Sequence, residues 1–263
     1  YMRPGAVVQP AGGFVERPRR ADAREKWHAA PGGCRVGTVA DGAGLGERFL
    51  MKLQVALDGD LDSSVAVLRA VRGAIDIAEI GTPLIIREGL RAARVLRREF
   101  PDLALLADLK IVDAGEHEAA LAFEAGCEFV TVLGVAQDST IRGALRAAAR
   151  FGRQIMADLM QVDDLVARSR ELLDLGCHCL CVHTATDLQA SGANPVADLA
   201  RLRAAFPAAC VAVAGGLDAA TVPALAPYRP DIIIVGGAIV TAPDPASAAR
   251  AIRARLDQTL DGC

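Results

Sequence analysis

A lysine between two aspartates is the first group of residues in this chain that could do chemistry. Asp108, Lys110 and Asp113 lie in the stretch "LLADLKIVDAGEHEA" (105–119), in a sequence where 26 of the 29 basic residues are arginines. Asp108 and Lys110 are two positions apart, so a β-strand would carry both on one face. Opposite charges this close keep each other ionised, which predicts a charged catalytic group or, alternatively, a structural ion pair. Asp113 would lie at the start of the next helix, where it could be an N-cap rather than a group that takes part in chemistry.

A second carboxylate, Glu79, could join Asp108 in binding a metal ion. Glu79 lies in "EIGTP", at the end of the apolar segment that precedes the one carrying Asp108. If the two segments are neighbouring parallel strands, both carboxylates lie at the same edge of the sheet. Magnesium takes few protein carboxylates and fills its other positions with water and substrate oxygens. We therefore expect one Mg²⁺ held by Glu79 and Asp108.

His183 supplies a group that can exchange protons near neutral pH. It is the one histidine of four at the predicted C-terminal end of a strand, so we interpret it as a catalytic acid or base. His178 opens the same strand and is expected to be structural.

The segment "CHCLCVH" also raises the question of a zinc site. We expect Cys177, Cys179, Cys181 and His183 to share one face of a strand. Alternate residues stand nearly 7 Å apart along a strand, at roughly 3.3 Å per residue. A tetrahedral zinc with Zn–S bonds of about 2.3 Å needs sulfurs roughly 4 Å apart. One strand cannot supply that geometry, so we interpret the cysteines as core residues.

Eight short apolar segments would position these groups, and helical patterns such as 84–99, 138–150, 163–175 and 244–256 separate them. The predicted strands are 52–58, 75–81, 103–110, 128–134, 154–159, 177–183, 210–216 and 231–237. Nearly continuous apolar runs are typical of parallel strands covered on both faces. Successive strand ends are about 25 residues apart, which predicts a (β/α)8 TIM barrel over 51–263 rather than an open doubly wound sheet. Asp138–Ser139, Asp163 and Asp218 are expected at helix N-caps.

Polar residues gather at the ends of these strands, where active sites of such barrels form. The ionisable residues at five strand ends are Asp58, Glu79, Asp108 with Lys110, Asp158 and His183. A buried charge must find a partner, so five charged ends indicate a site rather than stabilisation alone. The last two strands end in Gly215–Gly216 and Gly236–Gly237. Loops at those places commonly bind phosphate through backbone N–H groups, which predicts a phosphorylated substrate.

Residues 1–50 differ from the rest, with nine of the 25 glycines, four of the 13 prolines and no sustained periodicity. We expect a disordered extension there. A start codon placed too far upstream is the alternative, because Met51 opens the first strand.

Composition argues against several partners and locations. The net charge of −3 and the 4% aromatic content disfavour nucleic acid and anionic membranes, and no apolar run approaches a membrane span. The seven cysteines are odd in number and several lie in apolar runs, which predicts free thiols in the cytoplasm.

Motifs along residues 51–257 together resemble the 3-hexulose-6-phosphate synthase family, in the suprafamily of orotidine 5′-monophosphate decarboxylase. They include "MKLQVALD", "EIGTP", "ADLKxxDAGE", "VHTxxDxQAxGxNP" and "IVGGAI". The resemblance implies a reversible, magnesium-dependent aldol condensation of formaldehyde with D-ribulose 5-phosphate, through an enediolate, to D-arabino-3-hexulose 6-phosphate. It implies that Glu79 and Asp108 bind Mg²⁺ and that Lys110 lies beside the enediolate oxygens. It also implies that His183 is the acid/base, that Asp58 orients Lys110 or substrate hydroxyls, and that Asp113 reaches the neighbouring site of a homodimer.

Two alternatives stay open. One is 3-keto-L-gulonate 6-phosphate decarboxylase, a related family that resembles this chain less, because it carries arginines where this sequence has Thr186 and Gly237. The other is a barrel that binds a sugar phosphate without catalysis.

Overall fold

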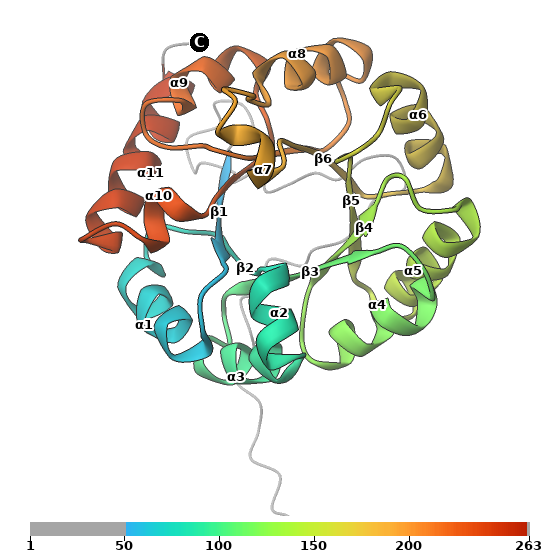
Figure 1. The fold of residues 1–263 in the computed structure, drawn as a ribbon, viewed down its shortest axis with the longest axis horizontal. Coiled ribbons are helices and arrows are strands. Elements are labelled where there is room, and N and C mark those ends of the chain that lie inside the picture. Colours follow the sequence, from blue (N-terminus) through green and yellow to red (C-terminus); the bar gives the residue numbers. More distant parts are fainter. Residues whose placement is uncertain (1–50, 262–263) are drawn as a thin grey trace, which may run out of the picture.

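Eight parallel strands form a closed barrel in the computed structural model, which describes the backbone of residues 51–261 and the side chains of residues 51–258 (Figure 1). Each strand pairs with the next, and the last pairs with the first. The strands are β1 (Lys52–Leu57), β2 (Ile77–Ile80), β3 (Ala104–Ile111), β4 (Phe129–Leu133), β5 (Gln154–Asp158), β6 (Cys179–His183), β7 (Val211–Ala214) and β8 (Ile232–Val235). The predicted TIM barrel is confirmed. The predicted disordered extension, 1–50, lies outside the described residues.

Helices surround the barrel, and most of them cover the outer side of the strands (Figure 1). They are α1 (Leu61–Val71), α2 (Thr82–Glu88), α3 (Arg91–Glu99), α4 (Gly115–Glu124), α5 (Asp138–Phe151), α6 (Leu165–Leu175), α7 (Thr186–Gln189), α8 (Val196–Ala205), α9 (Val222–Leu225), α10 (Gly237–Val240) and α11 (Pro245–Asp261). The stretch predicted as one helix, 84–99, forms two helices because Gly89 ends α2 with a φ of 58°. Within the described residues, no helix is long and apolar enough to cross a membrane.

The predicted N-caps are wrong by one residue at α5 and α6. Gln137 precedes α5, and Asp164, not Asp163, caps α6 by accepting the backbone N–H of Ala167. Asp218 accepts the backbone N–H groups of the turn that leads into α9. Side-chain geometry in the turn, rather than residue type, decides which aspartate becomes the cap.

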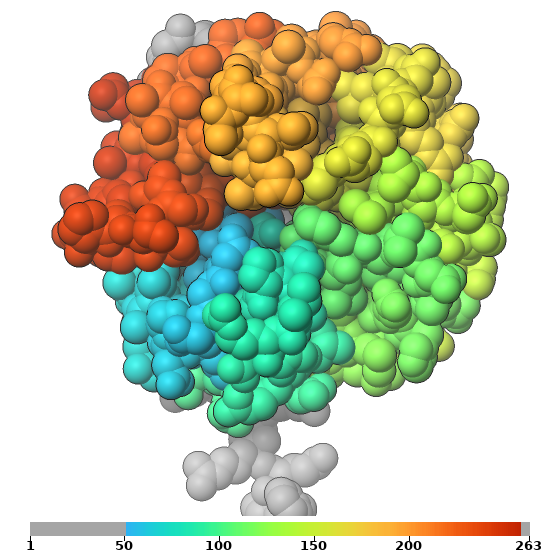
Figure 2. All heavy atoms as spheres, in the orientation of Figure 1, coloured from blue at the N-terminus to red at the C-terminus, as the bar shows by residue number. Residues whose placement is uncertain are grey.

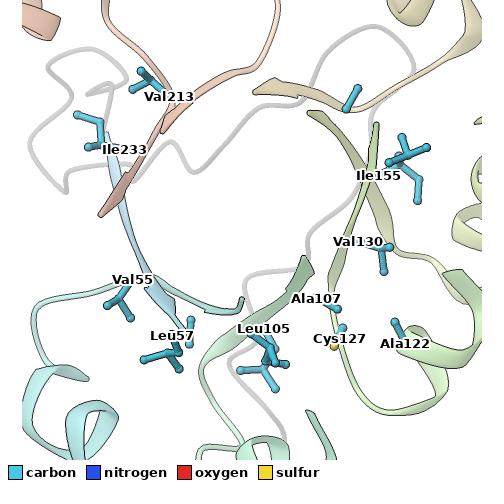
Figure 3. Packing of buried hydrophobic residues seen from close by; sticks show 14 of the residues in the cluster. Val55, Leu57, Leu105, Ala107, Ala122, Cys127, Val130, Ile155, Val213 and Ile233 are labelled. Atoms are coloured by element: carbon cyan, nitrogen blue, oxygen red, sulfur yellow. The ribbon is translucent and has the colours of Figure 1, made fainter. Parts of the chain in front are cut away.

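The core has two layers, because successive side chains of a strand point to opposite faces. Val55, Leu105 and Ile155 belong to the outer layer, between strands and helices (Figure 3). Leu106, Met156 and eleven other residues fill or adjoin the barrel interior; they are Ile77, Phe129, Cys179, Cys181, Cys210, Ala212, Ala214, Ile232, Ile234, Ala56 and Ala104.

Cys177 does not share the face of Cys179 and Cys181, so that expectation is wrong. Cys177 precedes β6 and packs in the outer layer, whereas Cys179 and Cys181 lie in the inner one. The strand begins two residues later than predicted, so its alternation does not extend back to Cys177. All five described cysteines are buried free thiols.

Arginine–carboxylate clamps close the floor of the barrel, the end at which the strands begin. Asp231, just before β8, accepts the backbone N–H of Val211 at 2.8 Å and a bond from Arg203 of α8 at 2.9 Å. Arg203 also donates to four backbone carbonyls of the surrounding loops. One guanidinium therefore fixes a carboxylate, a strand and two loops together.

The same clamp recurs around the floor. In one further clamp, Glu128 accepts bonds from Arg97 and from the backbone N–H of Leu105. In the other, Asp76 accepts bonds from Arg253 and from the backbone N–H of Leu53.

The clamps hold the starts of β1, β3 and β7, and the start of β5 departs from this pattern. There His178 accepts the backbone N–H of Ile155 through Nδ1 at 3.1 Å. Ala147 stands eight residues before Ile155, the spacing that separates Arg97 from Leu105. His178 thus has the place that a carboxylate takes elsewhere on the floor, which agrees with its predicted structural position.

Candidate active site

A cavity of about 710 Å³ opens at the mouth of the barrel, the end at which the strands finish. Figure 2 looks onto this face, which is hollowed at its centre between α2 and α7. On β3 and β6 the inner face changes from apolar to polar toward the mouth, as in Leu106, Asp108 and Lys110 on β3. This volume and this mixture of apolar and polar lining suit a small organic ligand.

Lys110 lies between two carboxylates at the centre of the cavity. Its Nζ donates to Asp108 Oδ2 at 2.8 Å and to Asp158 Oδ2 at 3.1 Å. Burial opposes the positive charge, but Asp108 and Asp158 outweigh it and raise the pKa of Lys110 above its usual value. Lys110 is therefore a fixed cation at neutral pH.

Asp158 connects Lys110 to His183. The Oδ2 atom of Asp158 also lies 2.9 Å from His183 Nδ1, and its Oδ1 accepts the backbone N–H of Met160. Burial opposes the charge of Asp158, yet the contacts with His183 and Lys110 lower its pKa. An ionised Asp158 accepts a hydrogen bond from the N–H at His183 Nδ1, which leaves Nε2 as the basic nitrogen. The sequence indicated only that Asp158 is an acid at a strand end. The available signal for its role was its position at the end of β5, because β5 lies beside β6, which carries His183, and two strands from β3, which carries Lys110.

Glu79 and Asp58 form the acidic side of the cavity together with Asp108. Burial first, and the charge of Asp108 second, raise the pKa of Glu79 to about 8. Partial burial and the charge of Asp108 also raise the pKa of Asp58. Carboxylates repel each other here because one lysine does not balance their charge.

The residues present fit a hard divalent cation. Gln54 donates to Glu79 Oε2 at 2.6 Å, while its own Oε1 is buried without a hydrogen-bond partner among the described residues. The described part of the chain holds no group of three or more His, Cys, Asp or Glu residues arranged around one metal position. A cation would therefore take the carboxylates of Glu79 and Asp108 and complete its shell with water and ligand oxygens, as Mg²⁺ does.

Two threonines hold Asp108 in place. Thr82 donates to Asp108 Oδ2 at 2.9 Å, and Thr131 donates to Asp108 Oδ1 at 2.7 Å. Sequence reasoning missed both. A polar residue inside the apolar strand "EFVTVLG" was the available signal for Thr131.

Glycine pairs at the ends of β7 and β8 also line the cavity. Gly215 and Gly216 have φ angles of 107° and 67°, and a Cβ on Gly215 would lie 2.4 Å from the carbonyl oxygen of Thr184. Gly236 and Gly237 follow β8 and begin α10. All four glycines line the cavity, so the structure brings them together with the charged groups.

Asp113 lies outside the lining of this cavity. It is exposed, and its carboxylate accepts the backbone N–H of Ala114 at 2.7 Å. Ala114, with a φ of 49°, occupies the N-cap position of α4, so the alternative role of Asp113 as an N-cap is wrong. Two apolar side chains are exposed on nearby loops: Val112 directly precedes Asp113, and Val135 lies in the loop between β4 and α5.

Comparison with known proteins gives independent evidence on the family of this chain. Residues 51–252 match the sequence profile described as the orotidine 5′-phosphate decarboxylase/HUMPS family. The chain belongs to this family. Within it, the chain is 41% identical over 209 residues to a 3-hexulose-6-phosphate synthase of Bacillus subtilis, covering 79% of this chain and 100% of that protein.

Solved structures of the family point the same way. The 3-hexulose-6-phosphate synthase from Salmonella typhimurium is 44% identical, with a TM-score of 0.78 over 80% of this chain and 100% of that one. The 3-keto-L-gulonate-6-phosphate decarboxylase from Vibrio cholerae is 26% identical, with a TM-score of 0.69 over 80% and 99%. The predicted resemblance is confirmed, and the chain is an enzyme of the synthase branch, a lyase.

Proposed function

We propose that the chain catalyses the magnesium-dependent aldol condensation of formaldehyde with D-ribulose 5-phosphate to D-arabino-3-hexulose 6-phosphate. The observation that carries this proposal is the hydrogen-bonded series Asp108–Lys110–Asp158–His183 beside the buried Glu79. It joins a fixed cation, a proton-transfer group and a pair of carboxylates within one cavity. The similarity to proteins named 3-hexulose-6-phosphate synthase supports the choice of substrates.

In this proposal Glu79 and Asp108 hold Mg²⁺. The ion would polarise substrate oxygens and stabilise the negative charge that develops on them. Charge balance supports this role, because burial and the charge of Asp108 raise the pKa of Glu79, and a bound cation would offset both.

His183 Nε2 takes the proton from C1 of ribulose 5-phosphate, since Asp158 holds Nδ1. The electron pair of the broken C–H bond gives an enediolate, and Lys110 Nζ stabilises its oxygens. Carbon C1 then forms the new bond to the formaldehyde carbon as the C=O π pair moves onto the formaldehyde oxygen, and that oxygen takes the proton held by His183 to become a hydroxyl. Arginine would suit this position less, because its planar group is broader than an ammonium point charge. Asp58, at the rim, orients substrate hydroxyls.

Backbone N–H groups of Gly215, Gly216, Gly236 and Gly237 bind the phosphate in this proposal. The positive φ angles of Gly215 and Gly216, and the absence of side chains there, support a close approach of an anion to the backbone after β7.

We also propose a homodimer in which Asp113 completes the neighbouring site. Its exposed carboxylate, away from its own cavity and next to the exposed Val112, supports this assignment. Free buried thiols support a reducing location such as the cytoplasm.

The test is formaldehyde consumption by purified protein with ribulose 5-phosphate, with and without Mg²⁺. Arg94→Ala, an exposed change on α3, serves as a control. Magnesium-dependent loss of formaldehyde, with the hexulose phosphate as product, supports the proposal. Absence of loss with folded protein rejects it, and release of carbon dioxide from 3-keto-L-gulonate 6-phosphate would then identify the decarboxylase.

A further inference from the structure

Strand β3 carries three residues where its neighbour β4 carries one. Ala107 pairs with Val130 and Ile111 pairs with Val132, so residues 108–110 stand opposite Thr131 alone. Such a bulge disrupts the ladder and leaves a backbone group without its usual partner. In this case the bulged segment is the one that carries both Asp108 and Lys110.

Lys110 has an unusual backbone conformation within this bulge. Its φ is 47°, in the left-handed region that residues with a Cβ avoid. A non-glycine residue keeps such a conformation only when its surroundings hold it there. The side-chain bonds from Nζ to Asp108 and Asp158 fix one end of the residue, and its backbone needs a separate partner.

The hydroxyl of Thr131 supplies that partner. Its Oγ1 accepts the backbone N–H of Lys110 at 2.9 Å and donates its own proton to Asp108 Oδ1 at 2.7 Å. One hydroxyl can do both, because it carries one proton and two lone pairs. Thr131 is 4% exposed, so water does not readily replace these bonds.

We propose that Thr131 is a positioning residue that builds the Asp-x-Lys geometry of the site. By bridging the backbone of Lys110 and the carboxylate of Asp108, it sets the bulge and the plane of the carboxylate at once. The catalytic roles of Lys110 and Asp108 rest on the proposed function, but the positioning of both residues can be measured without turnover.

The test compares Thr131→Val, which keeps the shape and removes the hydroxyl, with Thr131→Ser, which keeps the hydroxyl. Ser169→Ala is the control, because it removes a buried hydroxyl with no hydrogen-bond partner among the described residues. If the valine variant does not fold, Thr131→Ala replaces it. Three quantities are measured: exchange of the Lys110 amide proton by NMR, the affinity for Mn²⁺ alone, and the kcat and KM for ribulose 5-phosphate.

We expect the Lys110 amide of Thr131→Val to exchange about tenfold faster or more, because the buried acceptor of its N–H is lost. We expect Mn²⁺ to bind about tenfold more weakly, because Asp108 loses the hydroxyl that donates to its carboxylate. We expect kcat to fall roughly 100-fold while KM changes about threefold or less. Thr131→Ser should restore all three to within about threefold of the wild type.

Unchanged exchange and Mn²⁺ affinity in Thr131→Val would overturn the proposal. Equal losses in Thr131→Ser would also overturn it, because they would assign the effect to packing of the methyl group. If the wild type consumes no formaldehyde, the proposed function fails, and amide exchange and Mn²⁺ affinity still decide the role of Thr131.

Discussion

At the floor of the barrel each clamped carboxylate has its own guanidinium and its own backbone N–H, whereas at the mouth several carboxylates share one ammonium group. Asp231 is bonded to Arg203 and Val211, although burial still raises its pKa. At the mouth, Lys110 is the cation that acts on both Glu79 and Asp58. The floor therefore arranges charge for stability, and the mouth keeps an excess of negative charge that a ligand can balance.

Removing the shared cation should give the largest effect. Lys110→Ala should lower kcat about 1000-fold, because preorganised charge at the reacting oxygens is lost. Formaldehyde consumption at saturating ribulose 5-phosphate measures this. Lys110→Arg is the matched variant, and activity near that of the wild type would contradict the need for a compact ammonium group.

Weakening the connection between Lys110 and His183 should cost less. Asp158→Asn keeps the size of the side chain and removes its charge, so kcat should fall roughly 100-fold through misoriented imidazole. Urea unfolding separates this from a folding defect, since the loss of kcat should persist in protein with wild-type unfolding behaviour. An unchanged kcat would exclude Asp158 from the reaction.

The floor should respond in the opposite way. Arg203→Met should lower the free energy of unfolding by about 2 kcal/mol, because Asp231 and several carbonyls lose a buried donor. Urea unfolding measures the loss, and kcat of the folded variant should stay within about twofold of the wild type. A large fall in kcat would contradict the separation of the two ends.

A smaller effect should appear in the pH dependence of stability without metal. The pKa of Glu79 is raised from 4.5 to about 8, so between these values the folded chain keeps a proton that the unfolded chain has lost. Stability in a chelator should therefore fall as the pH rises from about 5 to about 8, by no more than about 1.4 kcal/mol per pH unit, the limit for one proton. Urea unfolding across this range measures it. Glu79→Gln should reduce the slope, and a slope equal to that of the wild type would contradict the assignment to Glu79.

The contrast between mouth and floor was partly visible in the sequence. Continuous apolar segments with polar ends predicted the barrel, and the strand boundaries agree within two or three residues. Alternation along β3 correctly placed Asp108 and Lys110 on one face. Cross-strand contacts could not be predicted, since the bond of Asp158 to Lys110 depends on tertiary packing across 48 residues of sequence.

Local backbone geometry was the other limit. Nothing in the residue types indicated that Lys110 adopts a φ of 47° or that Thr131 stands opposite three residues. The N-cap expected at Asp113 failed for a similar reason, because Ala114 takes a left-handed conformation there. A bulge and a left-handed residue are decided by which side chain reaches which backbone group, and that requires the closed barrel.

The clamp formed by Arg253 lies where the ring of strands closes, between β8 and β1. Arg253 of α11 donates to the carbonyl oxygens of Met51 and Ala74 and pairs with Asp76, so the last helix serves β1 as α3 serves β3 and α8 serves β7. The junction between β8 and β1 is thus built like the junctions inside the chain. A circularly permuted barrel, opened at another floor loop and joined across this junction, would keep every clamp of the ring.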